Sequence, residues 1–274
     1  MQAAIVQAFT QRIREKNPLI HSITNTVVQN FTANGLLAIG ASPVMADAPE
    51  EAGEMARMAD ALLINIGTLT SETRRAMDEA LRAANDKGIP TVLDPVGVGA
   101  TTYRTETVTH LLQVGSFTVI RGNIAEVANM IGRSLPIKGV DAGHVALDLR
   151  IDVARDAARH FNTIVAATGP EDVITDGKRT LIVQNGDVWM SKVTGVGCLL
   201  GAVVAAYVAV ADDPFWGTSA ALMAYGLAGE DARAMLRSEE KEGVGTYGVR
   251  LIDALGALSE RLREDRLKWY EVDG

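Results

Sequence analysis

The sequence predicts an α/β fold with a mostly parallel central sheet, helices on both faces of that sheet, and a helical C-terminal third. Two observations lead to this prediction. Short apolar runs alternate with amphipathic stretches up to about residue 167, which is the rhythm of β-α-β units with parallel strands. After a hairpin pattern, the rest of the chain is helical in character almost to its end.

Each element of the first part has its own signals. Residues 1–17 form an amphipathic helical pattern. The predicted strands are residues 62–67, 91–94, 117–121 and 163–167. The predicted helices are residues 71–87, 107–114, 124–131 and 152–161. Ser71 is the predicted N-cap of the first of these helices, and Gly88 is its predicted C-terminal stop.

The second part begins with a predicted antiparallel hairpin. Its strands are residues 173–175 and 180–183, and Asp176-Gly177 between them is a strong turn signal. The predicted helices that follow are residues 198–211, 218–236 and 249–262. The chain has no linker, internal repeat or low-complexity tract, so residues 1–274 are predicted to form a single domain.

Composition argues against several classes of protein. The 274 residues are 47% hydrophobic, enough for a large core, and a net charge of −8 disfavours nucleic acid or an anionic membrane as a partner. The single cysteine, Cys198, cannot form an internal disulfide or a Cys-rich zinc site, and we expect a cytoplasmic protein. Residues 193–211 are uncharged but rich in Ala, Gly and Val, so we interpret them as a buried helix rather than a membrane span.

The predicted strands end in polar or glycine-rich segments. In open parallel sheets, ligands bind beyond the carboxyl ends of the strands, so these segments are the expected binding site. They are residues 67–68, 94–97, 121–123 and 168–170.

The segment Thr194-Gly195-Val196-Gly197-Cys198 immediately precedes an apolar helix. Glycines let successive backbone N–H groups converge, and a helix N-terminus adds partial positive charge, so the segment suits a phosphoryl group. A tight turn before a buried helix explains the same residues equally well. The chain lacks both G-x-x-x-x-G-K-[ST] and G-x-G-x-x-G, which disfavours P-loop and dinucleotide-binding folds.

Three other segments allow a functional and a structural interpretation. Arg121 could grip phosphate and Glu126 a magnesium-bound water, but Asn123 and Glu126 also have the spacing of a helix capping box. Asp94 ends a hydrophobic strand, which suits a metal or phosphate site or a simple turn. His21 lies in a polar cluster, residues 21–27, between two helical patterns, where a lone histidine is more often structural.

Taken in order along the chain, these segments resemble those of the hydroxyethylthiazole kinases, a family of the ribokinase-like superfamily. The resemblance covers essentially the whole length. It is carried by His21-Ser22-Ile23-Thr24-Asn25-Thr26-Val27, Asp94-Pro95-Val96-Gly97-Val98-Gly99-Ala100-Thr101, Arg121-Gly122-Asn123-Ile124-Ala125-Glu126 and Thr194-Gly195-Val196-Gly197-Cys198. The first two segments are typical of the thiazole kinases, and the last two are forms of motifs found across the superfamily.

The resemblance implies a ribokinase-like fold and an activity. The implied reaction transfers phosphate from ATP to 4-methyl-5-(2-hydroxyethyl)thiazole, a step toward thiamine diphosphate. The implied cofactor is Mg²⁺, and the implied assembly is a homotrimer with substrate sites between subunits. The resemblance places Asn25, Met45, Gly67 and Gly195 at the thiazole, Arg121, Asn123, Thr168 and Gly169 at ATP, Asp94 and Glu126 at magnesium, and Arg121, Gly195, Gly197 and Cys198 in catalysis.

Cys198 departs from the superfamily pattern, in which an aspartate closes the glycine motif as the presumed base. A thiol at a helix N-terminus is expected to have a lowered pKa. The departure leaves other activities open. They are phosphorylation of a pyrimidine or pyridoxal alcohol, an ATP-dependent repair dehydratase, and a thiazole-binding sensor that has lost catalysis.

Overall fold

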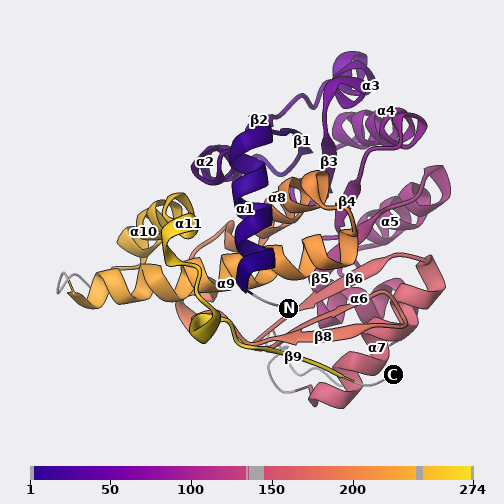
Figure 1. Cartoon of the computed structure of the whole chain (residues 1–274). Coiled ribbons are helices and arrows are strands. Elements are labelled where there is room, and N and C mark those ends of the chain that lie inside the picture. The colour runs from indigo at the N-terminus through magenta and orange to yellow at the C-terminus, as the bar shows by residue number, and fades with distance from the viewer. Residues whose placement is uncertain (1–2, 134, 136–144, 239–242, 273–274) are drawn as a thin grey trace.

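The computed structural model describes residues 3–133, 135, 145–238 and 243–272 (Figure 1). Within these residues the chain forms one nine-stranded sheet of order β2-β1-β3-β4-β5-β6-β7-β8-β9. The strands from β2 through β6 pair in parallel, and β7, β8 and β9 continue the sheet with antiparallel pairing. The predicted α/β class with a mostly parallel sheet is therefore confirmed.

The strands are short, and the interior ones are buried on both faces. Their bounds are β1 Leu19–Ile23, β2 Ser42–Val44, β3 Ala61–Asn65, β4 Thr91–Asp94, β5 Val119–Asn123, β6 Ile164–Thr168, β7 Asp172–Thr175, β8 Thr180–Val183 and β9 Trp269–Glu271. Alternate residues point to opposite faces, so Leu63 packs into one hydrophobic core while Leu62 and Ile64 pack into another.

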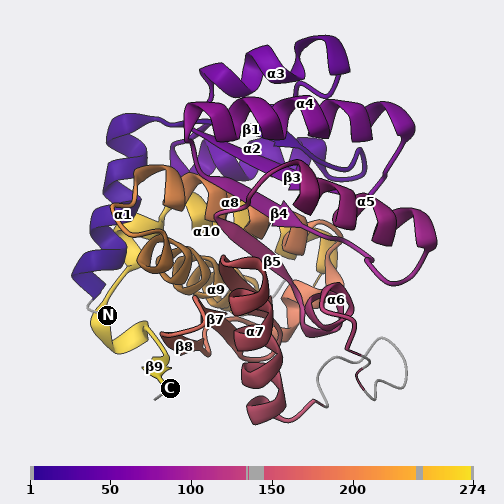
Figure 2. The same ribbon diagram turned by 90° about the vertical axis from the view of Figure 1, so that its right-hand side faces the viewer.

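Helices cover both faces of the sheet, as predicted. The larger core lies under α1 Ala3–Lys16, α2 Gln29–Ile39, α8 Val196–Val210, α9 Pro214–Ser238, α10 Val244–Gly256 and α11 Leu258–Arg261. The opposite face carries α3 Pro49–Met58, α4 Ser71–Lys87, α5 Thr102–Val114, α6 Ile124–Met130 and α7 Leu147–Phe161. Figure 2 shows α3, α4 and α5 side by side along this second face. Two short 3₁₀ helices, Val188–Lys192 and Glu264–Arg266, complete the described elements.

Several helix boundaries differ from the prediction. The N-cap of α4 is Thr70 rather than Ser71, because the Thr70 hydroxyl accepts a 3.0 Å hydrogen bond from the backbone N–H of Thr73 in a capping box. The stop at Gly88 is confirmed by its left-handed backbone, with φ of 76°. Helix α5 starts five residues before the predicted residue 107, where the side chain of Thr101 caps its first turn.

The N-terminal quarter and the C-terminus hold elements that the sequence analysis missed. The polar cluster 21–27 does not simply separate two helices, because its first three residues belong to β1, an interior strand between β2 and β3. His21 is fully buried there, and its Nε2 lies 2.7 Å from the backbone carbonyl of Ala46, which supports the structural interpretation. At the other end, the predicted helix 249–262 is divided into α10 and α11, and β9 adds a ninth strand.

The uncharged segment near residue 200 forms helix α8, which lies inside the protein as predicted. Nearly all of its side chains are buried, and it contacts both β3 and β4 as well as α9. No helix among the described residues is both long enough and apolar enough to cross a membrane.

Candidate active site

A continuous row of polar side chains crosses the carboxyl ends of five parallel strands. We call this set the polar row; it consists of Asn25, Asn65, Asp94, Arg121 and Thr168. Its hydrogen bonds run from Asn25 Nδ2 to Asn65 Oδ1 at 3.1 Å, from Asn65 Nδ2 to Asp94 Oδ2 at 2.8 Å, from Arg121 Nη1 to Asp94 Oδ2 at 3.3 Å and from Arg121 Nη2 to Thr168 Oγ1 at 3.0 Å.

Strand register explains why these side chains meet. Asn65 and Asp94 are direct partners in the parallel pairing of β3 with β4. Asn123 and Thr168 are direct partners in the pairing of β5 with β6. Asn65, Asp94 and Thr168 are each the last residue of their strand and follow an apolar run, so they lie at the carboxyl rim of the sheet.

Asp94 is the most deeply buried member of the polar row. Burial raises the pKa of its carboxyl to about 6, although the adjacent guanidinium of Arg121 opposes this shift. Glu126 contributes a smaller rise through like-charge repulsion. While Oδ2 receives bonds from Asn65 and Arg121, Oδ1 is buried and has no hydrogen-bond partner in the described part of the chain. One oxygen is therefore available for a further ligand or water.

The glycine motif forms the N-terminus of α8 beside the polar row. Gly195 is the N-cap with φ of 94°, and a side chain there would also lie 2.7 Å from Val28. The first helical hydrogen bond joins the N–H of Leu199 to the carbonyl of Gly195, and the preceding amides have no acceptor within a regular helix. A Cβ at Gly197 would lie 3.2 Å from Arg121 Nη2, so the backbone of the motif packs directly against the guanidinium.

Cys198 is tied to the polar row, but it does not have the lowered pKa that its position predicts. Its Sγ accepts a hydrogen bond of 3.2 Å from Asn25 Nδ2. Burial raises the pKa of the thiol, and the negative charge of Asp94 adds to the rise. Removing the thiolate from water outweighs the helix N-terminus here, so the sequence-based expectation of an acidic thiol is wrong.

Asn123 and Glu126 form the capping box that the spacing predicted. The side chain of Asn123 accepts from the N–H of Glu126 at 2.9 Å, and Glu126 Oε2 accepts from the N–H of Asn123 at 2.9 Å. Glu126 Oε1 also accepts from the N–H of Gly97 at 2.8 Å. This carboxylate therefore joins the loop after β4 to the start of α6, and each oxygen retains capacity for a second contact.

The residues expected at the thiazole lie along the same rim. Gly67 packs so closely on Asn25 that a Cβ at residue 67 would lie 2.6 Å from the Asn25 side chain. Its N–H donates to Asn65 Oδ1 at 3.0 Å. Met45 is half-buried just after the edge strand β2, which pairs with β1. Asn25 and Gly67 are thus brought into contact, while Met45 lies at the neighbouring strand end.

The turn after β6 is held by two charged residues. The N–H of Gly169 donates to Asp172 Oδ1 at 2.9 Å, and burial raises the pKa of Asp172 to about 6. Arg150 from α7 bonds the carbonyl of Glu171, and its Nη2 lies 2.6 Å from the position of a Cβ at Gly169. A side chain at residue 169 would therefore force Arg150 or the turn to move.

Two residues of the site escaped the sequence analysis. Asn65 was assigned to a buried strand, although an amide that ends an apolar strand beside the Asp94 strand was a usable signal. Arg104 donates to the carbonyls of Ile66 at 2.8 Å, Val96 at 2.5 Å and Gly67 at 2.5 Å, and so fastens the loops after β3 and β4 to each other. Nothing in the sequence distinguishes Arg104 from the other arginines.

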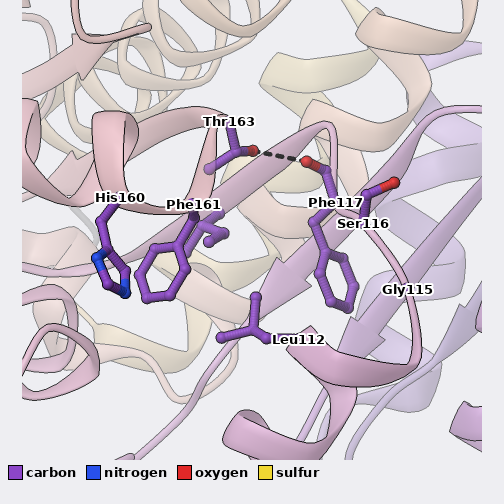
Figure 3. Close-up of a pocket in the computed structure, with 8 residues that line it drawn as sticks. Leu112, Gly115, Ser116, Phe117, His160, Phe161 and Thr163 are labelled. Atoms are coloured by element: carbon purple, nitrogen blue, oxygen red, sulfur yellow. Dashed lines mark hydrogen bonds between the residues drawn. The ribbon is translucent and has the colours of Figure 1, made fainter.

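A separate pocket lies at the opposite end of β5 and β6, and it is not the candidate site. It has a volume of about 220 Å³ and lies between α5 and α7, beside the residues that precede the two strands (Figure 3). Thr163 donates to the carbonyl of Phe117 at 2.7 Å within its wall, and His160 stacks edge-on against Phe161. The polar row is at the other rim of the sheet.

Solved structures with low sequence identity to this chain share its fold. The fold is ribokinase-like. It is similar to a ribokinase-like superfamily protein from Enterococcus faecalis V583 at 11% identity, 96% coverage of both chains and a TM-score of 0.66. It is also similar to an ADP/ATP-dependent NAD(P)H-hydrate dehydratase from Bacillus subtilis, at 17% identity, with 96% of this chain and 98% of that chain covered and a TM-score of 0.64.

The chain belongs to the hydroxyethylthiazole kinase family, whose sequence model matches residues 10–261. It is 41% identical to a solved hydroxyethylthiazole kinase from Pyrococcus horikoshii OT3, with 98% of this chain and 100% of that chain covered and a TM-score of 0.85. These findings confirm the predicted family, fold and enzyme class, and they support hydroxyethylthiazole as the phosphoryl acceptor.

Proposed function

We propose that the polar row and the N-terminus of α8 form the site at which the γ-phosphoryl group of ATP passes to the primary alcohol of 4-methyl-5-(2-hydroxyethyl)thiazole. The product, the thiazole phosphate, would serve thiamine diphosphate biosynthesis or salvage. One observation carries the assignment: Arg121 bridges Asp94 and Thr168 while packing against the backbone of Gly197. A cation, a helix N-terminus and a carboxylate thus converge on one point of the rim.

We assign the ATP phosphates to Arg121, Asn123, Thr168 and Gly169. Phosphoryl transfer passes through a loose transition state whose charge spreads over the phosphoryl oxygens, so positioning and electrostatic stabilisation do most of the work. Arg121 is well suited to this role because its side chain is almost entirely buried and its donors are held by Asp94 and Thr168. The backbone amides from Gly195 to Cys198 would complete the anion hole, and Gly197 among them packs against Arg121.

We assign magnesium to Asp94 and Glu126. The two carboxylates are close enough to interact electrostatically, and Asp94 Oδ1 is buried without a partner in the described structure. Among the described residues, no group of three or more His, Cys, Asp or Glu side chains could hold a metal ion. Two carboxylates fit Mg²⁺, which keeps several waters and takes its remaining ligands from phosphate. Bound there, Mg²⁺ would neutralise charge between the β- and γ-phosphates.

We assign the thiazole to the rim beside Asn25, Met45, Gly67 and Gly195. Asn25 lies between Gly67 and Cys198, so an alcohol placed there would be next to the anion hole. Burial raises the pKa of the Cys198 thiol, so the sulfur keeps its own proton at neutral pH and is not available to accept the proton of the alcohol. We therefore propose that Cys198 orients the alcohol and contributes little as a base.

We propose a single kinase domain, residues 1–274, that assembles as a homotrimer with substrate sites between subunits. The nine-stranded sheet contains strands from residue 19 to residue 271, which supports a single domain. Val27, two residues after Asn25, is 68% exposed. Coverage by a neighbouring subunit would remove this apolar side chain from water. Light scattering should give three times the chain mass; an active monomer would contradict the shared site.

An ADP-release assay against a panel of alcohols tests the reaction. Wild-type protein with Mg²⁺ and ATP should release ADP in proportion to hydroxyethylthiazole, and mass spectrometry should detect the thiazole phosphate. Faster turnover with a hydroxymethylpyrimidine or pyridoxal would identify another acceptor instead. Thiazole binding without any ADP release would indicate the sensor, and conversion of a hydrated nicotinamide nucleotide would indicate the dehydratase.

A further inference from the structure

Tyr225 contacts the glycine motif from the buried core. It lies near the middle of α9, is 1% exposed, and donates a 2.7 Å hydrogen bond from Oη to the backbone carbonyl of Val196. Val196 is the first helical residue of α8, between Gly195 and Gly197 of the candidate anion hole. A fully buried hydroxyl therefore contacts the backbone that would bind the transferring phosphoryl group.

The hydrogen bond from Tyr225 affects the peptide group between Val196 and Gly197. The carbonyl of Val196 and the N–H of Gly197 belong to the same planar trans peptide, in which O and H point in opposite directions. A hydrogen bond that holds the oxygen from inside the core therefore directs the N–H the opposite way, out of the core, and Arg121 lies beside the same residue, Gly197. Accepting that bond also polarises the peptide, which makes its N–H a stronger donor.

We propose that Tyr225 is a positioning residue for phosphoryl transfer, whose hydroxyl fixes and polarises the Val196–Gly197 peptide so that the Gly197 amide stabilises the transition state. This inference rests on the proposed function of the glycine motif. Burial raises the pKa of Tyr225 well above its ordinary value, so the hydroxyl keeps its proton and remains a donor throughout the neutral range.

A second buried tyrosine provides a matched control. Tyr247 of α10 is also fully buried and donates from its hydroxyl to a backbone carbonyl, that of Gly229 at 3.1 Å. Its acceptor lies within α9 and not in the glycine motif. Removing either hydroxyl deletes one buried bond to a helical carbonyl, so the two changes should cost similar stability and differ in their effect on catalysis.

The test compares Tyr225→Phe and Tyr247→Phe by steady-state kinetics with ATP, Mg²⁺ and hydroxyethylthiazole. We expect Tyr225→Phe to lower kcat by about 3- to 10-fold, the equivalent of one hydrogen bond, while both KM values stay within about twofold. Tyr247→Phe should keep kcat within about twofold. Unchanged kcat in Tyr225→Phe, or an equal loss in Tyr247→Phe, would overturn the inference.

A binding measurement separates positioning from a general structural effect. The complex of MgADP, aluminium fluoride and hydroxyethylthiazole mimics the transferring phosphoryl group. Its affinity should fall in Tyr225→Phe by the same factor as kcat, while affinity for MgADP alone stays at the wild-type value; equal losses in both would contradict positioning. If Tyr225→Phe is unstable at room temperature, the same measurements are made at low temperature, where bound thiazole stabilises the folded variant. Absence of wild-type kinase activity would contradict the proposed function and this inference together.

Discussion

Asn65 donates a 2.8 Å hydrogen bond to Asp94 from the position directly opposite it in the parallel pairing of β3 with β4. The same amide accepts from Asn25, which in turn reaches Cys198. Asp94 is joined on its other side to Arg121. The acceptor-binding end and the phosphate-binding end of the candidate site are therefore linked through one buried asparagine.

Asn65→Ala should damage catalysis although no role in chemistry is assigned to Asn65. The change removes a donor from Asp94 and an acceptor from both Asn25 and the Gly67 amide. We expect a loss of about 1–3 kcal/mol in the free energy of unfolding and a kcat at least about 10-fold lower. Asn34→Ala, on the exposed face of α2, is the control for both measurements. Wild-type kcat in Asn65→Ala would show that the polar row is not catalytically coupled.

Glu126→Gln should separate the capping role from the magnesium role. Glutamine retains one side-chain oxygen, which can still accept from the N–H of Asn123, so α6 should remain formed although the Gly97 amide loses its acceptor. Loss of the negative charge should raise the Mg²⁺ concentration for half-maximal rate by about 10-fold or more. Initial rates across a magnesium titration, with thermal unfolding as the check on folding, measure this. A magnesium dependence equal to that of the wild type would assign Glu126 to capping alone.

Cys198→Ala should retain measurable activity, and Cys198→Asp should retain or increase it. Burial raises the pKa of the thiol, so the thiol is protonated and is a poor base. Changing this side chain also leaves the backbone donors of the glycine motif in place. We expect Cys198→Ala to keep at least about a tenth of the wild-type kcat. Such a loss is smaller than the ~10²–10⁴-fold loss expected on removal of a well-matched base. Complete loss of turnover in a folded, ATP-binding Cys198→Ala protein would show that the thiol is essential.

Gly169→Ala should weaken ATP binding. A methyl group at residue 169 would lie 2.6 Å from Arg150 Nη2, so either the turn after β6 or the arginine must move. We expect a several-fold increase in the KM for ATP, about 1 kcal/mol, with a smaller change in the KM for the thiazole. Gly53→Ala on α3, where a methyl group meets only ordinary van der Waals contacts, is the control. Equal ATP affinity in both variants would remove Gly169 from the ATP site.

Asp172→Asn should change how stability depends on pH. Burial raises the pKa of Asp172 to about 6, so the folded state holds this proton more tightly than the unfolded chain, whose aspartates titrate near pH ~4. Its stabilising contribution is complete below about pH 4 and is lost as the pH rises through about 6. Asparagine keeps an acceptor for the Gly169 amide and cannot ionise.

The advantage of Asp172→Asn over the wild type in free energy of unfolding should therefore grow by about 2–3 kcal/mol between about pH 4 and pH 7. Urea denaturation across this range measures it. Asp86→Asn, an exposed position near the end of α4, should show no such growth. Parallel stability curves for wild type and Asp172→Asn would contradict the raised pKa of Asp172.

Local signals predicted most of the central fold. The strand β4 was located to the residue because an apolar run ends at a single aspartate, and the hairpin of β7 and β8 because Asp176-Gly177 marks its turn. The strands β2 and β9 were missed because each has three residues at or near an edge of the sheet, too few for a periodic pattern. Their pairing depends on neighbours distant in sequence, which a local pattern cannot reveal.

The residues of the candidate site likewise include some that the sequence predicted and some that it did not. Asp94, Arg121 and Thr168 follow recognisable strand ends, and the sheet brings them together as the strand-end rule requires. Asn65 and Arg104 act through hydrogen bonds whose partners are set by strand register and loop packing. The pKa of Cys198 was predicted in the wrong direction because the sequence shows the helix N-terminus but not the depth of burial or the nearby Asp94.

A crystal structure with hydroxyethylthiazole, Mg²⁺ and a non-hydrolysable ATP analogue tests the central claim most directly. Our account predicts the thiazole ring beside Asn25 and Gly67, with its hydroxyl facing the amides of residues 195–198. The γ-phosphate should lie within hydrogen-bond distance of Arg121, and the metal should contact Asp94 or Glu126 directly or through water. Density for the thiazole or the phosphates away from this rim, with the polar row free of ligand, would contradict the account.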